Sequence, residues 1–267
     1  MADIVLKINN LTRTFGAFTA VDAITLSINS GEIFGLLGSN GAGKTTTIKM
    51  LTTLLPPSSG DALVGGFSIT KQSVDVRRVI GYVPQAVSVD GSLTGYENLL
   101  IFSKLYDLPQ SEQHSRITEA LRFMNLTAVA DRIVGQYSGG MVRRLEIAQA
   151  TLHRPQVLFL DEPTVGLDPI ARDAVWKLLV NLRTNYGTTL IFTTHYLEEA
   201  ESHCDRMAIM HLGKMVAVGT CAELETLLGK GSHTLNDVFD HFAGTSSEAG
   251  GKLGNVSAER ATEQRLG

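Results

Sequence analysis

The segment Gly38–Thr45 constrains the fold more than any other part of the chain. It reads Gly-Ser-Asn-Gly-Ala-Gly-Lys-Thr and matches the phosphate-binding pattern G-x-x-x-x-G-K-[ST]. The short apolar stretch Glu32–Leu37 precedes it, and apolar residues at helical spacing follow it until Pro56. A strand, a glycine loop and a helix in this order form half of a parallel α/β unit, so the sequence predicts an α/β fold.

The residue types of this loop suit a nucleotide polyphosphate. Glycines let backbone N–H groups wrap the β-phosphate, Lys44 reaches the β- and γ-phosphate oxygens, and the Thr45 hydroxyl is a ligand for Mg²⁺. A glycine-rich turn without a ligand would explain neither the lysine nor the hydroxyl. We therefore expect a nucleotide-binding loop that comprises Gly38, Ser39, Asn40, Gly41, Ala42, Gly43, Lys44, Thr45 and Thr46.

Two carboxylates, Asp161 and Glu162, follow the apolar stretch Val157–Leu160, which is typical of a strand buried on both faces of a parallel sheet. Nucleotides bind at the edge where the carboxyl ends of such strands meet. We expect Asp161 to hold Mg²⁺ through water and Glu162 to polarise the attacking water. A strand-end pair alone is often only a solvated turn, but beside a phosphate loop it predicts a hydrolytic site, where a base contributes roughly 10²–10⁴-fold in rate.

His195 and Gln85 follow two other predicted strands. A lone histidine is more often structural than catalytic, but the strand before His195 would end at the same edge as Asp161. We therefore expect His195 to donate a hydrogen bond to the γ-phosphate. From the residues alone, Gln85 is equally well interpreted as a surface amide.

The rest of the chain divides into distinct parts. Residues 4–28 alternate apolar and polar side chains around Gly16, which predicts antiparallel strands. Residues 93–150 are mostly helical in pattern, which predicts a helical subdomain inserted into the α/β chain. Its third helix begins at Ser138 with two glycines, a good N-cap beside N–H groups that an anion can approach. Asp168 followed by proline predicts another helix start.

Composition limits the classes of function. The chain has 267 residues, of which 43% are hydrophobic, enough for a large core. A formal net charge of −4 argues against the broad basic face of a nucleic-acid binder. Cys204 and Cys221 are too widely separated for a zinc or thioredoxin-type pair, which fits a reducing cytosol. No apolar run approaches the ~20 residues that span a bilayer, so we expect any membrane work to require a partner.

Taken in order, these motifs resemble the ATP-binding subunit of ATP-binding cassette (ABC) transporters over roughly residues 4–224. The matching elements are the phosphate loop, Gln85 as the glutamine loop, Ser138-Gly139-Gly140 as the signature motif, Gly166–Asp168 as the dimer-contact loop and His195 as the switch histidine. The resemblance implies a P-loop NTPase cassette with a RecA-like parallel sheet core, an N-terminal antiparallel β subdomain and a helical subdomain at about 86–152. It also implies ATP with Mg²⁺ as cofactors.

The resemblance further implies roles for individual residues. Lys44, Gln85, Glu162 and His195 would be catalytic, and Gln85 would join Thr45 and Asp161 around Mg²⁺. Ser138, Gly139 and Gly140 would close over the γ-phosphate held by a second copy in a head-to-tail dimer. Phe15 would stack on adenine, although a role in the strand core is almost equally supported. Tyr137 and Met141 depart from the usual Leu-Ser-Gly-Gly-Gln, so we expect altered affinity for closure.

The resemblance also suggests a subgroup and a setting. Residues 225–243 are predicted to be an amphipathic helix, and residues 244–267, rich in glycine, serine and charge, a disordered tail. The segments 219–224 and 234–239 after the cassette resemble exporters of the daunorubicin-resistance and nodulation-factor groups. Such an ATPase would be peripheral at the cytoplasmic face of the inner membrane, bound to an ABC-2 type permease, and would export a drug, lipid or saccharide-type amphiphile. The alternative is a cassette ATPase that acts on DNA or ribosomes. Its DNA-repair members need a coiled coil, for which residues 85–138 leave no room, and its translation members usually carry two cassettes.

Overall fold

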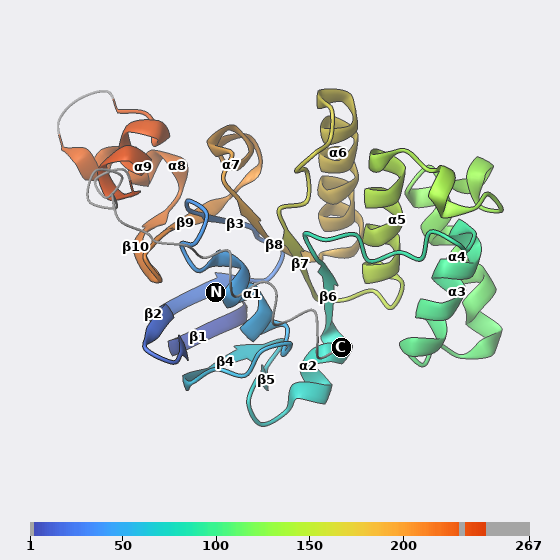
Figure 1. Ribbon diagram of the computed structural model, residues 1–267, viewed down its shortest axis with the longest axis horizontal. Helices are drawn as coiled ribbons and strands as arrows, with labels where there is room; N and C mark the ends of the chain where they lie inside the picture. Colours follow the sequence, from blue (N-terminus) through green and yellow to red (C-terminus); the bar gives the residue numbers. More distant parts are fainter. Residues whose placement is uncertain (1–2, 230–232, 244–267) are drawn as a thin grey trace.

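The computed structural model describes residues 3–229 and 233–243, which form two β-sheets surrounded by helices (Figure 1). Residues 244–267, predicted to be a disordered tail, lie outside the described residues. The first sheet is antiparallel, with the strand order β2-β1-β4-β5. Its strands are β1 (Ile4–Phe15), β2 (Phe18–Asn29), β4 (Ser59–Val64) and β5 (Phe67–Ser68). The predicted antiparallel pair around Gly16 is therefore confirmed.

The second sheet has the order β10-β9-β3-β8-β7-β6, and its neighbouring strands are parallel except for β9 and β10. Its strands are β3 (Ile33–Leu37), β6 (Ile80–Val83), β7 (Val157–Asp161), β8 (Thr189–Thr194), β9 (Arg206–His211) and β10 (Lys214–Gly219). The predicted α/β fold with a parallel sheet is confirmed. Strands β3, β7 and β8 are adjacent, so their carboxyl ends meet at one edge.

Strand β7 shows why the parallel sheet requires continuous apolar sequence. Val157 and Phe159 pack in the core shared with the antiparallel sheet and α1 (Lys44–Leu51), whereas Leu158 and Leu160 pack in the core on the other face. All four side chains are fully buried. Successive side chains of a strand point to opposite faces, so both faces are covered. Each such side chain contributes about 1.5–3 kcal/mol to folding.

The helices follow the predicted order. Between β6 and β7 the chain forms an insertion whose helices share one apolar core, and Figure 1 shows it beside the parallel sheet. The remaining helices are α2 (Ser73–Val79), α3 (Gly95–Leu105), α4 (Gln110–Phe123), α5 (Gly139–Thr151), α6 (Pro169–Tyr186), α7 (Leu197–His203), α8 (Cys221–Glu225) and α9 (Leu235–Ala243), and short 3₁₀ turns occur at Thr127–Val129, Val134–Gln136 and Thr226–Leu228. The domain boundaries at 86–152 and 224 stay predictions.

The C-terminal helix is shorter than predicted. A single helix over 225–243 is wrong, because α8 ends at Glu225 and a 3₁₀ turn follows. Gly229, with φ of 97°, stops this turn. The second helix, α9, begins after Thr234, whose hydroxyl accepts a hydrogen bond from Asp237 N at 3.3 Å. Apolar residues of α9 pack on α7, α8 and β9.

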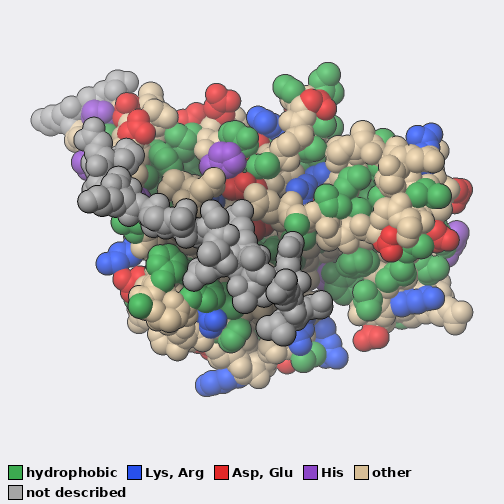
Figure 2. Space-filling model, in the orientation of Figure 1, with side chains coloured by type: hydrophobic (Ala, Val, Ile, Leu, Met, Phe, Trp, Pro, Cys, Tyr) green, Lys and Arg blue, Asp and Glu red, His purple; other side chains and the backbone are tan. Residues whose placement is uncertain are grey.

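The surface carries charges of both signs. Figure 2 shows Lys and Arg side chains scattered among Asp and Glu over the described residues of that face. Among the helices within residues 3–229 and 233–243, none combines the length and apolar character needed to cross a membrane.

Candidate functional site

The phosphate loop lies between the end of β3 and the start of α1. Gly41 and Gly43 have φ values of 84° and 104°, which favour glycine. A Cβ atom at Gly43 would lie 2.5 Å from the carbonyl oxygen of Ala20 in β2. Gly213, in the turn between β9 and β10, faces the same oxygen, and a Cβ there would lie 2.9 Å from it. The backbone N–H of Gly213 also donates to the carbonyl oxygen of Ala42 at 3.0 Å, so backbone holds the loop on two sides. The free N–H groups of the first turn of α1 follow the loop.

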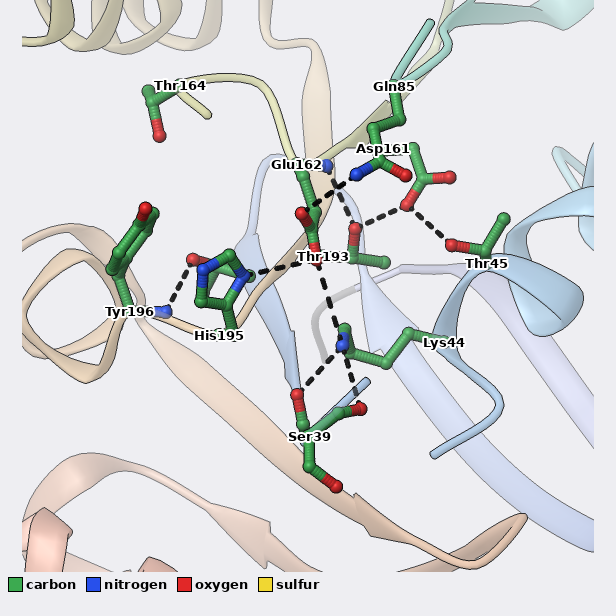
Figure 3. A network of polar contacts seen from close by, with 12 residues as sticks. Ser39, Lys44, Thr45, Gln85, Asp161, Glu162, Thr164, Thr193, His195 and Tyr196 are labelled. Atoms are coloured by element: carbon green, nitrogen blue, oxygen red, sulfur yellow. Dashed lines mark hydrogen bonds and ion pairs between the residues drawn. The ribbon is translucent and has the colours of Figure 1, made fainter. Parts of the chain in front are cut away.

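Lys44 is a buried cation at the centre of the loop (Figure 3). Its Nζ donates hydrogen bonds to the carbonyl oxygens of Gly38 at 2.7 Å and Ser39 at 3.2 Å. Burial lowers the pKa of Lys44, while Glu162, 3.9 Å from Nζ, and Asp161 oppose this shift. The loop thus places one positive charge beside both predicted carboxylates.

Asp161, at the end of β7, connects the loop to β8. Its Oδ1 accepts hydrogen bonds from the hydroxyls of Thr45 at 3.1 Å and Thr193 at 2.6 Å. The Thr193 hydroxyl also accepts from the backbone N–H of Glu162 at 2.9 Å. Thr193 therefore holds both carboxylate residues, a role that sequence reasoning missed. The parallel register, in which Asp161 pairs with Thr193, is the signal that could have found it.

Three predicted catalytic residues meet at Glu162. Its Oε1 lies 3.2 Å from His195 Nδ1, and its Oε2 accepts a hydrogen bond from Gln85 Nε2 at 3.2 Å. Glu162 is 7% exposed and has φ of 48°, a backbone conformation that costs about 1–3 kcal/mol outside glycine. The contacts around it hold the carboxylate in this position. Lys44, Gln85 and His195 approach it from different segments, as Figure 3 shows.

A cavity of about 430 Å³ opens beside this network, within the range of small-molecule sites. Its lining includes Asn40, Gly41, Ala42, Gly43, Lys44, Thr45, Thr46, Gln85 and Glu162, all of them predicted site residues, together with Phe18 and Ala20. Gly38 and Ser39 contact Lys44 through their carbonyl oxygens, which accept hydrogen bonds from its Nζ. The buried cation and the helix start suit a polyphosphate. The side-chain oxygens of Thr45, Asp161 and Gln85 are ligands of the kind Mg²⁺ takes, so the residues fit both groups.

The aromatic residue that lines this cavity is Phe18, and the stacking of Phe15 on adenine stays a prediction. Phe15 is 46% exposed, so the alternative role in the strand core is wrong. The Arg13 guanidinium lies 4.6 Å from its ring centroid. Phe18, which pairs with Phe15 across the hairpin, lines the cavity and is 64% exposed. Phe18 could not be predicted from the sequence, because both rings flank the same turn and no periodicity distinguishes them.

The signature residues lie apart from this cavity. Ser138 is the N-cap of α5 and accepts a hydrogen bond from Met141 N at 3.3 Å, as its residue type predicts. Gly139 and Gly140 open the helix, and neither they nor Ser138 line the cavity. A Cβ at Gly140 would lie 2.9 Å from the Ala171 side chain of α6. The bare helix start therefore has close packing behind it.

The structure explains why a tyrosine stands at position 137, where the usual signature motif has leucine. Its hydroxyl donates to the carbonyl oxygen of Val129 at 2.6 Å. Its ring lies against Gly95, where a side chain would collide with the hydroxyl. Tyr137 thus anchors the start of α5 to α3, and Gly95 makes room for the larger ring.

The loop after Glu162 is tied to the histidine segment. Asp168 caps α6 by accepting from Ala171 N at 2.9 Å, as predicted, while its role across a dimer stays a prediction. Glu199 of α7, 5% exposed, accepts hydrogen bonds from the hydroxyls of Thr164 and Thr194. These contacts join the loop that follows Glu162 to the residue preceding His195.

Comparisons with known proteins bear directly on this site. A family model described as "ABC transporter" matches residues 21–165. The linearmycin resistance ATP-binding protein of Bacillus subtilis is 42% identical over 224 residues, which cover 84% of this chain and 72% of that protein. The daunorubicin/doxorubicin resistance ATP-binding protein of Streptomyces peucetius is 42% identical over 84% of this chain and 68% of that one. The resemblance to the daunorubicin-resistance group is confirmed.

A solved structure extends the likeness to the arrangement of the chain. The dimeric, post-hydrolysis structure of an ATP-binding cassette with ADP and Pi is 26% identical, with a TM-score of 0.71. It covers 80% of this chain and 98% of its own. The matched family, the relatives and the geometry around Lys44 and Glu162 lead to one conclusion. The chain belongs to the ABC transporter family and is one of its ATP-binding and ATP-hydrolysing subunits.

Proposed function

We propose that this subunit drives a separate membrane permease of the ABC-2 type and exports an amphiphilic drug. The observation that carries the proposal is the identity of 42% to resistance ATP-binding proteins over 84% of the chain. Their names associate them with linearmycin and with daunorubicin and doxorubicin. The cargo class that we propose also includes lipids and saccharide-type amphiphiles.

The residues around the cavity support a division of labour in hydrolysis. Mg²⁺, held by Thr45, Asp161 and Gln85, would neutralise phosphate charge when bound. Glu162 accepts a proton from the attacking water, and the amide of Gln85 orients its carboxylate at 3.2 Å. His195 Nδ1 lies 3.2 Å from the same carboxylate, and its imidazole would donate a hydrogen bond to the γ-phosphate. Phe18, rather than Phe15, is the ring next to the cavity that adenine would use.

The signature residues require a second copy. They do not line the cavity of their own chain, yet they present a hydroxyl and the N–H groups at a helix start. The positive end of α5 stabilises phosphate charge only when it faces the loop of another chain. The dimeric form of the related cassette supports a head-to-tail pair. ATP would close this pair, and hydrolysis would open it.

The permease would choose the cargo and anchor the subunit. The likeness to the ATP-binding proteins of drug resistance supports a peripheral position at the cytoplasmic face, bound to a permease. The test is a mild-detergent pull-down of the tagged protein from its own cells, followed by mass spectrometry. We expect a multi-span membrane protein that lacks its own cassette. Recovery of ribosomal or DNA-repair proteins without such a partner would overturn the transport function and leave the ATPase chemistry standing.

A further inference from the structure

Arg143 and Glu146 form a buried ion pair on α5, the helix that begins with the signature glycines. Arg143 Nη1 and Glu146 Oε2 are 3.0 Å apart, and the two side chains are 8% and 1% exposed. Burial raises the pKa of Glu146, while Arg143 and hydrogen bonds from Ser88 oppose this shift. A buried ion pair returns its desolvation cost only with further hydrogen bonds, and an apolar pair of similar size often stabilises as well. Folding stability alone therefore does not explain this pair.

Both side chains hold the connection between β6 and α3, which carries Gln85. Arg143 donates from Nη1 to the carbonyl oxygen of Pro84 at 2.8 Å and from Nη2 to that of Gln85 at 3.4 Å. Glu146 Oε1 accepts from the backbone N–H of Ser88 at 2.6 Å and from its hydroxyl at 3.0 Å. The pair therefore holds this connection on both sides of Gln85.

Around Gln85 itself the connection is open to solvent. Residues 85–88 are exposed, so water covers their outer side. Farther along, Gln149 of α5 donates to the Asn98 side chain at 3.4 Å, and Asn98 donates to the carbonyl oxygen of Asp90 at 2.9 Å. Helix α5 thus contacts the connection directly through Arg143 and Glu146, and indirectly through Asn98 of α3.

We propose that Arg143 and Glu146 are positioning residues that fix Gln85 relative to the signature helix, so that Gln85 reaches Glu162 only when α5 is correctly placed. The chain of contacts runs from the start of α5 through the ion pair to the backbone of Gln85, and from its amide to Glu162. Movement of α5 on closure of the dimer is thereby transmitted to the hydrolytic carboxylate. This inference rests on the proposed roles of Gln85 and Glu162.

The test replaces the pair by apolar residues of similar size in the full-length chain, Arg143→Met with Glu146→Leu. This variant should unfold at the wild-type temperature or above it, because the exposed segment can bind water in place of the pair. We expect unchanged affinity for ATP and a kcat at least about tenfold lower, since small displacements of a catalytic group cost up to about 10²-fold. A stable variant with wild-type kcat would overturn the proposal.

A second measurement separates positioning from a structural role. In the wild type, Gln85→Ala should lower kcat, whereas in the apolar double variant it should cause little further loss, because Gln85 is already displaced. Equal losses of kcat in the two backgrounds would contradict the positioning role of Arg143 and Glu146. An unchanged kcat for Gln85→Ala in the wild type would contradict the proposed role of Gln85 and, with it, this inference. If the double variant does not fold, Arg143→Gln, which is too short to keep the hydrogen bonds to Pro84 and Gln85, replaces it in the same comparison, with the same outcomes.

A matched control alters an ion pair that does not touch the segment. Arg154, which is half exposed, and Glu119, which is about a third exposed, form a surface pair at 2.9 Å. Replacing both by glutamine should leave kcat within about twofold of the wild type, because exposed pairs contribute little. A comparable loss of kcat in this control would show that the effect is not specific to Arg143 and Glu146, and the proposal would fail.

Discussion

At the scale of single residues, Glu162 is where three segments meet, and its substitution tests the hydrolytic assignment. The variant Glu162→Gln keeps the shape of the side chain but cannot accept a proton. We expect it to bind ATP normally, to hydrolyse it about 10²–10⁴-fold more slowly and to accumulate as a closed dimer. Phosphate release and size-exclusion chromatography in ATP measure the two effects. Near-normal turnover would show that Glu162 is not the base.

Lys44 supplies the buried positive charge of the loop, so its removal should weaken nucleotide binding. Charge-assisted hydrogen bonds contribute about 1.5–3 kcal/mol each, which predicts about 10- to 100-fold weaker ATP affinity for Lys44→Ala. Calorimetry measures this affinity. Lys49→Ala is the matched control, because Lys49 lies exposed on the last turn of the same helix. Equal affinities for the two variants would count against the assignment.

Substitution of Thr193 tests whether its buried hydroxyl holds both Asp161 and Glu162. Thr193→Val leaves the backbone N–H of Glu162 without its acceptor, which should lower the free energy of unfolding by about 1–3 kcal/mol. Asp161 also loses its shortest contact, so half-maximal ATPase activity should need more Mg²⁺. Urea unfolding and Mg²⁺ titration measure the two effects. Thr184→Val, on the exposed side of α6, should change neither.

The sequence predicted residues whose chemistry is local and missed those defined by neighbours. Lys44, Asp161 and Glu162 follow from the loop pattern and the strand end. Thr193 gains its role only because β8 lies beside β7 in parallel register. Phe18 lines the cavity only because the hairpin turns it that way. Neither fact is visible without the sheet.

At the scale of elements, His153 links the end of α5 to β6 and predicts a pH dependence. Burial lowers the pKa of His153 to about 4, although the hydrogen bond to the carbonyl oxygen of Ile80 opposes this. Its ring stacks on Tyr106, 3.9 Å away. The unfolded chain binds the proton at about pH 6.5, so this contribution to stability is complete above that pH and is lost as the pH falls towards 4.

The measurement compares the wild type with His153→Phe, which keeps an aromatic ring against Tyr106. Relative to this variant, the wild type should lose about 3 kcal/mol of unfolding free energy between pH 7.5 and pH 4. Urea unfolding at several pH values gives the difference. Parallel stability curves for the two proteins would contradict the prediction.

Element boundaries followed from the sequence where a side chain marks them. Ser138 and Asp168 are N-caps in the structure, as their residue types predict. The helix predicted over 225–243 failed because the chain is interrupted at Gly229, with φ of 97°, and the sequence has no apolar residue between Leu228 and Leu235 to continue the period. Strand and helix order was predictable because each apolar run is long enough to have one clear period.

At the scale of the whole molecule, Ser138 tests whether the site is completed by a second copy. The cavity of one chain lacks Ser138, so Ser138→Ala should retain ATP binding and lose ATP-driven dimerisation. Sedimentation in ATP measures dimerisation, and calorimetry measures binding. The lost cap costs about 0.5–2 kcal/mol of stability, so Thr220→Ala, which removes the N-cap of α8, is the control. Full dimerisation of Ser138→Ala would argue against the head-to-tail pair.

The architecture was largely predictable, because the sequence segregates into strand pairs, a helical insertion and alternating strands and helices. What sequence patterns could not give is the distance between segments. The buried pair on α5 illustrates this, since Arg143 and Glu146 look like part of a solvated helix face until β6 and its following segment are placed against them. Long-range contacts of this kind depend on the packed fold.

The close approach of two backbone segments to the carbonyl oxygen of Ala20 restricts the amino acids that this fold accepts at Gly43 and Gly213. Two segments that are 170 residues apart, at Gly43 and Gly213, crowd one carbonyl oxygen so closely that neither leaves room for a methyl group. In a library that samples every amino acid at both positions, only glycine should survive selection. Gly16 and Gly31, whose surroundings are open, should tolerate asparagine or aspartate. The requirement for glycine at these two positions would thus persist even in a selection for folding alone, without any selection for ligand binding.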